Sequence, residues 1–501
     1  MAITPGPSLN SVPAPQKQTL NTNYLDLSSA ANAGWGQQYV PDLMEKEAEV
    51  FGPRTISGFL SQVGAEESMT ADQVIWSEQG RLHLSYKGLV TNSTGANAGT
   101  GASNTITVTT DIDGLTPTKH GVRVNDMVII ANANGVHKCL VTAVTGNLTF
   151  EVYAYDLGAG GLADTTDTTG TTILVYGSEY GKGVSYMVGG TSTAEQESRG
   201  ANEPLFKTFT NKPIIMKDYY EVSGSDVSKI GWVEVASENG ASGYLWYLKA
   251  ESDTRARFND YIEMAMLESE KGVTATGIID GSNVMTGTTA GDQVGTEGLF
   301  EAIEQRGNLT SGITGVNAAT DLAEFDAILA EFDSQGAIEE NMMFVNRATS
   351  LAMDDMLASM NSYGAGGTSY GVFDNSEDMA LNLGFSGFRR GSYDFYKSDF
   401  RYLNDLATRG GVNTAAGSNA IRGVMVPAGT STVYDQMLGK NLKRPFLHVR
   451  YRASQTDDRR MKTWTTGSVG AATSALDAMQ IHMLTERCLV TQGANNFMLL
   501  K

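Results

Sequence analysis

One stretch of 28 residues without proline, SGYLWYLKAESDTRARFNDYIEMAMLES (242–269), constrains the fold most strongly. Its apolar residues recur at spacings of three and four, which predicts a single amphipathic helix. At 1.5 Å per residue such a helix is about 40 Å long and crosses a whole domain. The residues of its apolar side are Tyr244, Tyr247, Leu248, Phe258, Tyr261, Ile262 and Ala265.

The segment NEPLFKTFTNKPIIMKDYYEVSGSDVSKIG (202–231) carries much apolar surface without a clear period. Large apolar groups that have no local core favour an interface. Either the rest of the chain covers them, or a second copy of the chain does. The residues concerned are Phe206, Phe209, Ile214, Ile215, Met216, Tyr219 and Tyr220.

Length and composition describe a globular protein of two or three domains. The chain has 501 residues, 41% hydrophobic and 18% charged, and no apolar run approaches the roughly 18 residues of a membrane helix. Its two cysteines, Cys139 and Cys488, lie far apart, which favours a reducing compartment and no disulfide framework. With no secretory signal pattern at its start, we expect a cytosolic product.

The charge balance argues against a protein that grips nucleic acid. The chain has 36 Lys and Arg against 56 Asp and Glu, a net charge of −20. Sequence-independent binding to phosphates needs concentrated cations. The densest basic pairs are only Arg389-Arg390 and Arg459-Arg460. The composition therefore argues against a DNA-binding regulator.

The first 40 residues read as an extended arm. Four of the 11 prolines fall within the first 15 residues, separated by Ser, Asn and Gln, and such a segment cannot build its own core. A disordered tail is the alternative. The following PDLMEKEAEVF (41–51) has Pro41 where a helix begins, with apolar residues along one side.

Between residues 91 and 181 the composition changes to dense Gly, Thr and Asn, with 3 basic and 8 acidic residues. Short β-type runs recur at 105–109, 127–131, 139–144, 148–154 and 172–176. These predict an independent small β-barrel or sandwich. The flanking segments 82–90 and 183–190 are also strand-like and are expected to pair as the stem of a long hairpin.

The second half of the chain predicts alternating helices and strands. DLAEFDAILAEFDSQG (321–336) is expected to be a helix, with Asp321 and Glu324 as a capping box and Gly336 at its end. In 342–360 a strand leads into a helix that Asn346 caps. The residues 479–490 and 497–500 predict two closing strands.

No motif for catalysis or metal binding is found. The five histidines have no metal-ligand spacing, and His482 is expected to lie on the strand face opposite Ile481 and Met483. GSEYGKG (177–183) fails the phosphate-loop spacing, and DIDG (111–114) lacks the glutamate of a calcium loop, which favours a turn. We expect no catalytic, cofactor-binding or metal-binding residue.

Three segments, taken in order, resemble the major capsid proteins of tailed phages of the Hong Kong 97 type. The hairpin before the long helix (about 73–220, then 242–269) looks like an extension loop and a spine helix. ENMMFVNRATSLAMDDML (340–357) looks like a passage of the axial domain, and HMLTERCLVTQGANNFMLLK (482–501) like the closing strands. Locally, ISGFLSQVGAEESMTADQVIWSEQGRLHLSY (56–86) is similar to capsid proteins of crAss-like phages.

The resemblance implies an α+β Hong Kong 97-type capsid fold with an inserted small all-β domain. The implied parts are an N-terminal arm (1–40), a helical segment of the peripheral domain (41–72), an extension loop (73–220) that contains the inserted domain (91–181), the peripheral domain with the spine helix (221–275), the axial domain (276–445) and the closing strands of the peripheral domain (446–501).

The resemblance also implies the function. The chain would form hexamers and pentamers of an icosahedral head that encloses double-stranded DNA without sequence-specific binding. It would be assembled in the bacterial cytoplasm, with a portal and decoration or head-fibre proteins as partners and no membrane. In this family the extension loop lies on a neighbouring subunit, which makes the apolar residues of 206–220 candidate intersubunit contacts.

Three alternatives remain open from the sequence. An encapsulin-type bacterial cargo shell shares the fold but usually lacks a large β insertion and a long Pro-rich arm. An enzyme without a recognisable motif, such as a hydrolase, would be a small soluble oligomer. A tail or adhesin protein fits the Gly- and Thr-rich module but not the long helices.

Overall fold

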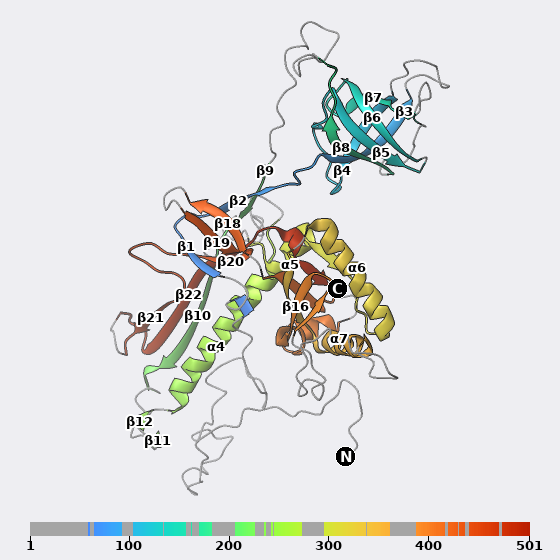
Figure 1. Cartoon of the computed structure of the whole chain (residues 1–501). Coiled ribbons are helices and arrows are strands. Elements are labelled where there is room, and N and C mark those ends of the chain that lie inside the picture. The colour runs from blue at the N-terminus through green and yellow to red at the C-terminus, as the bar shows by residue number, and fades with distance from the viewer. Residues whose placement is uncertain are drawn as a thin grey trace. The chain divides into compact units, whose positions relative to one another are not determined.

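In the computed structural model the chain divides into two compact units, Met1–Trp76 with Phe209–Lys501, and Ser77–Thr208 (Figure 1). The predicted arm at 1–40 and the predicted helix at 41–51 lie outside the described residues. Among the described residues, no helix has the length and apolar character needed to cross a membrane. The structure describes residues 59–60, 65–92, 104–133, 135–156, 162, 170–182, 206–225, 235–236, 242–243, 245–272, 295–336, 338–360, 387–415, 419–428, 430–435, 440–469 and 473–501.

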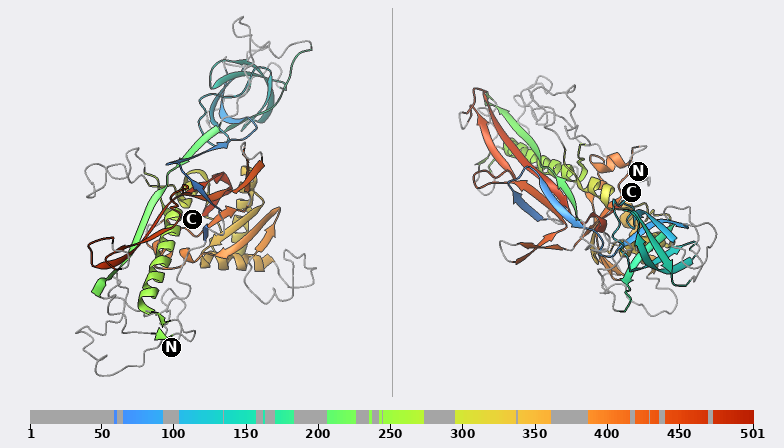
Figure 2. Two further views of the ribbon diagram at one scale, coloured as in Figure 1. Left: turned by 90° about the vertical axis from the view of Figure 1, so that its left-hand side faces the viewer. Right: turned by 90° about the horizontal axis from the view of Figure 1, so that it is seen from above.

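The unit Ser77–Thr208 is built around a closed barrel of antiparallel strands (Figure 2). Alternate residues fill its interior, as in Thr149–Ala154, where Phe150 and Val152 have 0% exposure. Since strand side chains alternate between two faces, the intervening residues point outward. In barrel order the strands are β3 (Ser85–Asn92), β4 (Asn104–Asp111), β7 (Thr149–Ala154), β6 (Gly135–Val144), β5 (Asp126–Asn132) and β8 (Thr171–Ser178).

The expected pairing of 82–90 with 183–190 needs a correction. β3 pairs with β4 and β8, so it is part of the barrel wall, while 183–190 lies outside the described residues. The reason is that Tyr86 and Val90 are inward residues of the barrel core, which only neighbouring barrel strands can cover. The DIDG segment is a turn, as predicted, with Asp111 Oδ1 accepting from Leu115 N at 2.7 Å.

The other unit contains a five-stranded sheet with the long helix α4 (Leu245–Glu268) against β10 and β22 (Figure 1). The helix confirms the prediction for 242–269, and its Phe258 and Ile262 are buried with Met483. Tyr261 is 46% exposed, contrary to expectation, because the buried side follows Phe258, Ile262 and Met266 at spacings of four. The strands run in the order β1 (Ala65–Met69), β20 (Leu447–Arg452), β22 (Ala478–Thr491) and β10 (Ile214–Ser223), and β21 (Lys462–Gly467) also pairs with β22.

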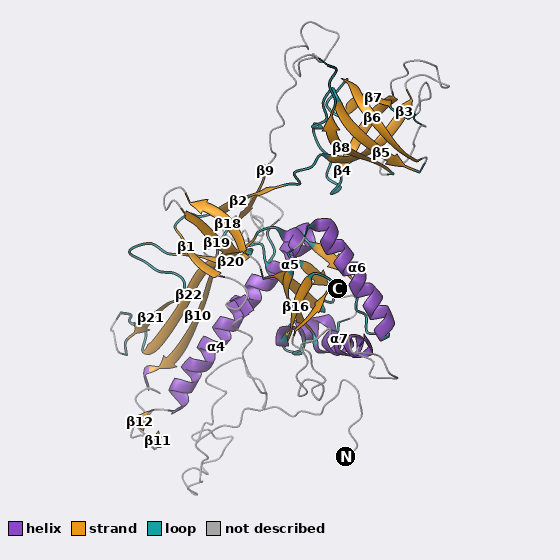
Figure 3. Cartoon of the chain, viewed as in Figure 1, coloured by secondary structure: helices purple, strands orange, loops and turns teal. Residues whose placement is uncertain are grey.

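A six-stranded sheet in the same unit is buried on both faces (Figure 3). Met343 and Val345 pack with α6 (Ala318–Gln335) and α7 (Arg347–Met360). Phe344 belongs to the second core, with α5 (Leu299–Arg306). Continuous apolar strands are typical of a sheet covered on both sides. Its order is β13 (Asn308–Thr310), β23 (Met498–Leu500), β17 (Gly423–Pro427), β14 (Glu340–Val345), β16 (Tyr393–Asp399) and β15 (Gly387–Arg390).

The smaller elements form short pairs and turns. β2 pairs with β9, β11 with β12, and β18 with β19. The bounds of these strands and of the short helices are β2 (Val74–Gln79), β9 (Phe206–Asn211), β11 (Val235–Ala236), β12 (Ser242–Gly243), η4 (Arg401–Leu403), α8 (Arg409–Asn413), β18 (Thr430–Asp435), β19 (Lys440–Pro445) and η5 (Ala494–Asn496).

The helix caps confirm one prediction and overturn another. Asn346 caps α7, since its Oδ1 accepts from Thr349 N at 2.8 Å. The predicted capping box of α6 is wrong. Asn317 is the cap, accepting from Thr320 N at 2.9 Å, and the helix begins one turn earlier than expected. Gly336 ends this helix in the left-handed conformation, with φ 67°, as predicted.

Replacement of Phe150 by Ala tests the filled barrel. Removing a fully buried ring should cost about 3–5 kcal/mol of the barrel's free energy of unfolding. Hydrogen exchange of the amides in β4 and β7 should accelerate accordingly. Val144→Ala is the control, because Val144 is 41% exposed and its truncation should change the free energy by no more than about 0.5 kcal/mol. Equal effects of both substitutions would contradict a packed interior.

Candidate assembly surface

Strand β10 divides its side chains between two environments. Tyr220 and Val222 are buried, at 3% and 4% exposure, on the side that faces α4. Met216 packs on the same side against Phe258 and Ile262 of the helix. Since side chains alternate along a strand, the odd-numbered residues of β10 face the other way. Of the five candidate residues in β10, the three with even numbers, Ile214, Met216 and Tyr220, therefore lie on the side that the chain itself covers.

The opposite face of the sheet is open and carries a row of aromatic rings. His482 on β22 is the register partner of both Tyr219 on β10 and Trp464 on β21. The ring centroids of Tyr219 and His482 are 6.0 Å apart, and those of Trp464 and His482 are 5.2 Å apart, both stacked. Tyr219 is 55% and Trp464 37% exposed. Stacked rings in one cross-strand row form a flat apolar surface.

His482 lies on the face opposite Ile481 and Met483, as its position in the strand predicts. Ile481 is 7% and Met483 1% exposed. The imidazole Nε2 is 2.7 Å from Thr466 Oγ1, so the ring is held by a hydrogen bond as well as by its two aromatic neighbours. Within the described chain it forms part of a surface row, with no cluster of His, Cys, Asp or Glu there able to hold a metal ion.

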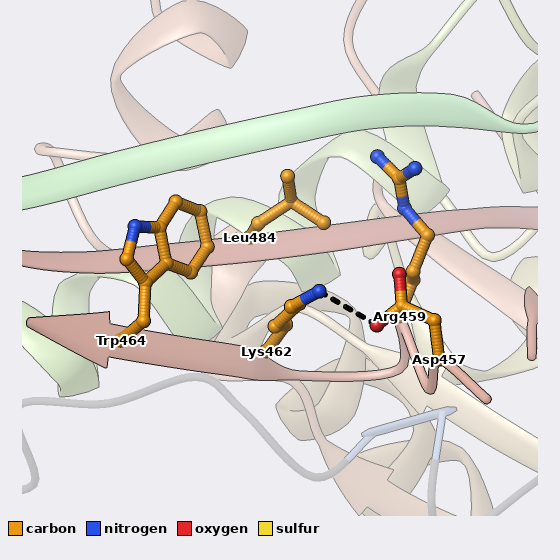
Figure 4. A pocket seen from close by; sticks show the side chains of 5 residues that line it. All are labelled: Asp457, Arg459, Lys462, Trp464 and Leu484. Atoms are coloured by element: carbon orange, nitrogen blue, oxygen red, sulfur yellow. Dashed lines mark hydrogen bonds and ion pairs between the residues drawn. The ribbon is translucent and has the colours of Figure 1, made fainter.

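A shallow pocket of about 330 Å³ adjoins the aromatic row (Figure 4). Trp464 and Leu484 supply its apolar wall. Lys462 Nζ is 2.6 Å from Asp457 Oδ1, and Arg459 Nε is 2.9 Å from Glu486 Oε2. The cations of the pocket are thus already neutralised by carboxylates of the same chain. The pocket suits an apolar group better than a free anion.

Ion pairs across the strands hold this part of the sheet. Glu66 on β1 contacts both Arg460 and, at 3.3 Å, Arg487 of β22. Glu486, whose side chain is only 6% exposed, lies between Arg452 and Arg459. A buried carboxylate is tolerated where cations surround it. These pairs fix β1, β20 and the turn after β20 relative to β22.

Phe209 is covered at the base of the β2–β9 pair. The guanidinium of Arg306 lies 4.4 Å from the centroid of the Phe209 ring and 5.6 Å from that of the Trp76 ring. Arg306 also pairs with Glu297 at 2.7 Å. A cation over aromatic faces stabilises both strands at this point. Asn211, fully buried, donates to Leu489 O at 2.7 Å and anchors the end of β9.

The seven residues singled out by the sequence therefore differ in their surroundings. Tyr220 is buried by the chain itself, and Ile214 and Met216 are partly buried against its cores. Ile215 and Tyr219 are 54% and 55% exposed. Phe206 lies in β9, and its side-chain surroundings are outside the description. Sequence reasoning did not identify Trp464, although the alternating KTWTTG run was its available signal.

A second polar cluster ends α4. Glu268 Oε1 accepts from the Tyr402 hydroxyl at 2.7 Å, and Glu268 Oε2 pairs with Arg409 NH1 at 2.7 Å. Burial raises the pKa of Glu268 and also that of Tyr402. Because each member already has a partner in the chain, the cluster ties α4 to η4 and α8.

No family model and no curated protein matches the chain. Among solved structures it is similar to one titled "Microbacterium phage Oxtober96", with 9% identity, 95% of this chain and 99% of that chain covered, and a TM-score of 0.37. It is also similar to one titled "Mycobacterium phage Ogopogo" (8% identity, 93% and 98% covered, TM-score 0.38). A third is the capsid structure of the cyanophage P-SCSP1u (6% identity, 93% of both chains covered, TM-score 0.38). These similarities cover almost the whole chain, but the sequence identities and TM-scores are low.

The two cysteines give a prediction about pH. Cys139 and Cys488 are free and buried, and burial raises the pKa of each thiol to about 12. At pH 8 the folded chain should therefore react very slowly with a thiol reagent, and two thiols per chain should appear on unfolding. In the unfolded chain the thiols ionise near pH 9, whereas in the folded chain they stay protonated. The thiols' contribution to the free energy of unfolding is therefore complete below about pH 9 and is lost as the pH rises toward 12. Rapid labelling of the native chain at pH 8 would contradict the burial.

Proposed function

We propose that this chain is the major capsid protein of a tailed phage, of the Hong Kong 97 type, which self-assembles into hexamers and pentamers of an icosahedral head around double-stranded DNA. The observation that carries the proposal is the divided sheet: α4 covers one face, while Ile215, Tyr219 and Trp464 are exposed on the other. An apolar face of this kind is suited to contact between subunits.

The order of the elements supports the same proposal. A long helix follows the segment that resembles an extension loop, and it lies along β10 and β22. The closing residues supply β22 to one sheet and β23 to the other, in the part of the chain that resembles the closing strands of these capsid proteins. The segment 56–86, which is similar to crAss-like phage capsid proteins, contributes β1 and β2. A closer relation to that group is part of the proposal.

The negative net charge suits a shell that encloses a genome and lets that genome move. At a net charge of −20 the chain offers no concentrated cations for phosphates. The arginines of the sheet are instead paired with carboxylates of the chain itself, as Arg459 is with Glu486. A lining that repels DNA allows it to slide during packaging and ejection. The shell therefore encloses DNA without binding a sequence.

Within this proposal the barrel is an inserted domain exposed on the outside of the head, where decoration or head-fibre proteins would meet it. Its interior is filled by apolar side chains, among them Ile106, Val128 and Ile130 with 0% exposure. Any recognition therefore uses its outer surface. Residues 1–40 are proposed to lie as an arm on neighbouring subunits, with Ile215 and Tyr219 as the exposed contacts of β10.

Electron microscopy of the purified chain tests the proposal directly. The expressed protein should form closed particles with sixfold and fivefold capsomers. The variant Ile215→Asp/Tyr219→Asp should lose them, because two charges would be buried in the contact. The subunit itself should keep its secondary structure and melting temperature, since both side chains are exposed.

Leu406→Asp is the matched control, because Leu406 is 73% exposed and lies in a turn after η4, outside the strands of the five-stranded sheet. It should assemble like the original chain. Particles that contain only protein cargo in the native source would favour the encapsulin alternative, and elution of the original chain as a stable monomer or dimer would favour the enzyme. Unchanged assembly of the doubly charged variant would contradict the role of β10.

A further inference from the structure

The outer wall of the barrel has two unlike sides. On one side, formed by β3, β4 and β7, a cross-strand row joins Thr91, Thr105 and Glu151. The neighbouring row contains Thr107 and Thr149 beside Leu89. This side is polar, as expected for a solvated strand face.

The other side, across β8, β5, β6 and β7, is apolar in two consecutive rows. Register places Leu174, Ile129 and Lys138 in one row, and Tyr155, whose backbone N–H donates to Lys138 O, extends it. The second row contains Met127, Leu140 and Tyr153, and Tyr176 lies at the bulge of β8 beside Met127. We call these eight residues the barrel patch.

The barrel patch is apolar except for Lys138, and five of its eight side chains are exposed, while Met127, Ile129 and Leu140 are half-buried. Tyr153, Leu174, Tyr176 and Tyr155 are 36%, 37%, 43% and 48% exposed. Tyrosine and methionine are enriched at protein interfaces, and contiguous apolar surface on one side of a domain marks a contact site. The barrel core is complete without these side chains, because a separate set of inward residues fills it.

The charges of the patch are arranged to match a copy of the same patch. Lys138 is its one charged member and lies in the central strand β6, with no ion pair to any described residue. Glu179 lies at the rim, where its Oε2 accepts from the Tyr155 hydroxyl. When two copies of one surface meet about a twofold axis, a group on one side of the axis faces the group that lies equally far on its other side, so Lys138 of one copy meets Glu179 of the other where the axis runs midway between them.

We propose that the barrel patch binds the barrel patch of a second copy of this chain, with Lys138 of each copy paired with Glu179 of the other. A patch four strands wide and two rows deep covers only a few hundred Å², given strand spacings of about 4.8 Å. That is below the roughly 1,000 Å² expected of a stable specific interface. The contact is therefore weak between free subunits and strong where many copies are held near one another.

The inference adds a contact to the proposed shell but is testable without it. Covalent capture suits a weak contact, and the two native thiols are buried and unreactive. The full-length chain with Leu140→Cys is treated with a short bismaleimide, and dimers are counted on a denaturing gel. Thr91→Cys, exposed on the polar side of the barrel, is the matched control. Dimers should form at least about tenfold more with Leu140→Cys.

Charge reversal then tests the pairing. In the Leu140→Cys chain, Lys138→Glu should lower the dimer yield at least about fivefold, because like charges meet across the contact. Adding Glu179→Lys should restore it. Hydrogen exchange of β6 must be unchanged in each variant, which excludes misfolding as the cause of a low yield.

The possible outcomes distinguish the barrel contact from the proposed capsid function. A dimer yield no higher than that of Thr91→Cys would overturn a second copy as the occupant, and failure of the double reversal to restore the yield would overturn the Lys138–Glu179 pair. Cross-linked dimers without any particles would support the barrel contact and contradict the capsid function. Particles without cross-links would support the capsid function and contradict the barrel contact.

Discussion

The fold of the larger unit depends on strand β22, which joins parts of the chain that are far apart in sequence. Along its 14 residues it pairs with β10, β20 and β21. Its Met483 packs on α4, and its His482 faces the opposite side with Tyr219 and Trp464. A shift of one residue in this pairing would exchange the two faces. The register of β22 therefore decides which residues form the core and which form the surface.

The same alternation of strand side chains gives each unit a surface distinct from its core. In the sheet, α4 seals one face and leaves the aromatic row on the other. In the barrel, closure seals the inner face and leaves the barrel patch outside. Both units are complete cores without these exposed side chains, so covering the surfaces would add stability through association rather than through folding. Two such surfaces are what the proposed assembly from many copies requires.

Local sequence patterns predict those elements whose pattern carries its own physical cause. The barrel strands, α4, the strand–Asn346–helix passage and the closing strands are all present at the expected positions. Pairing is not local, and so the sequence does not reveal it. β10 and β22 are separated by more than 250 residues, and nothing in either run names the other as its partner.

The errors follow from the same limit. For α6, Asn317 and Asp321 are both good caps, and only the tertiary position of Gly315, which donates to Asp321 Oδ1, decides between them. For the candidate contacts, no period divides the apolar residues of 206–220, so the sequence presents them as one set. The position of α4 separates the covered residues of β10 from the exposed ones, because Tyr220 lies on the side of α4 and Tyr219 does not. Trp464 becomes part of the surface only through its pairing with His482.

In the proposed assembly, association covers the outer face of β10 and β22, and α4 already covers the inner face. Hydroxyl-radical oxidation, read by mass spectrometry, measures this directly in free subunits and in assembled particles. Oxidation of Tyr219 and Trp464 should fall severalfold on assembly. Tyr261, exposed on α4, is the internal comparison. Buried Tyr220 should stay protected in both states. Equal oxidation of Tyr219 and Trp464 in the two states would contradict the account.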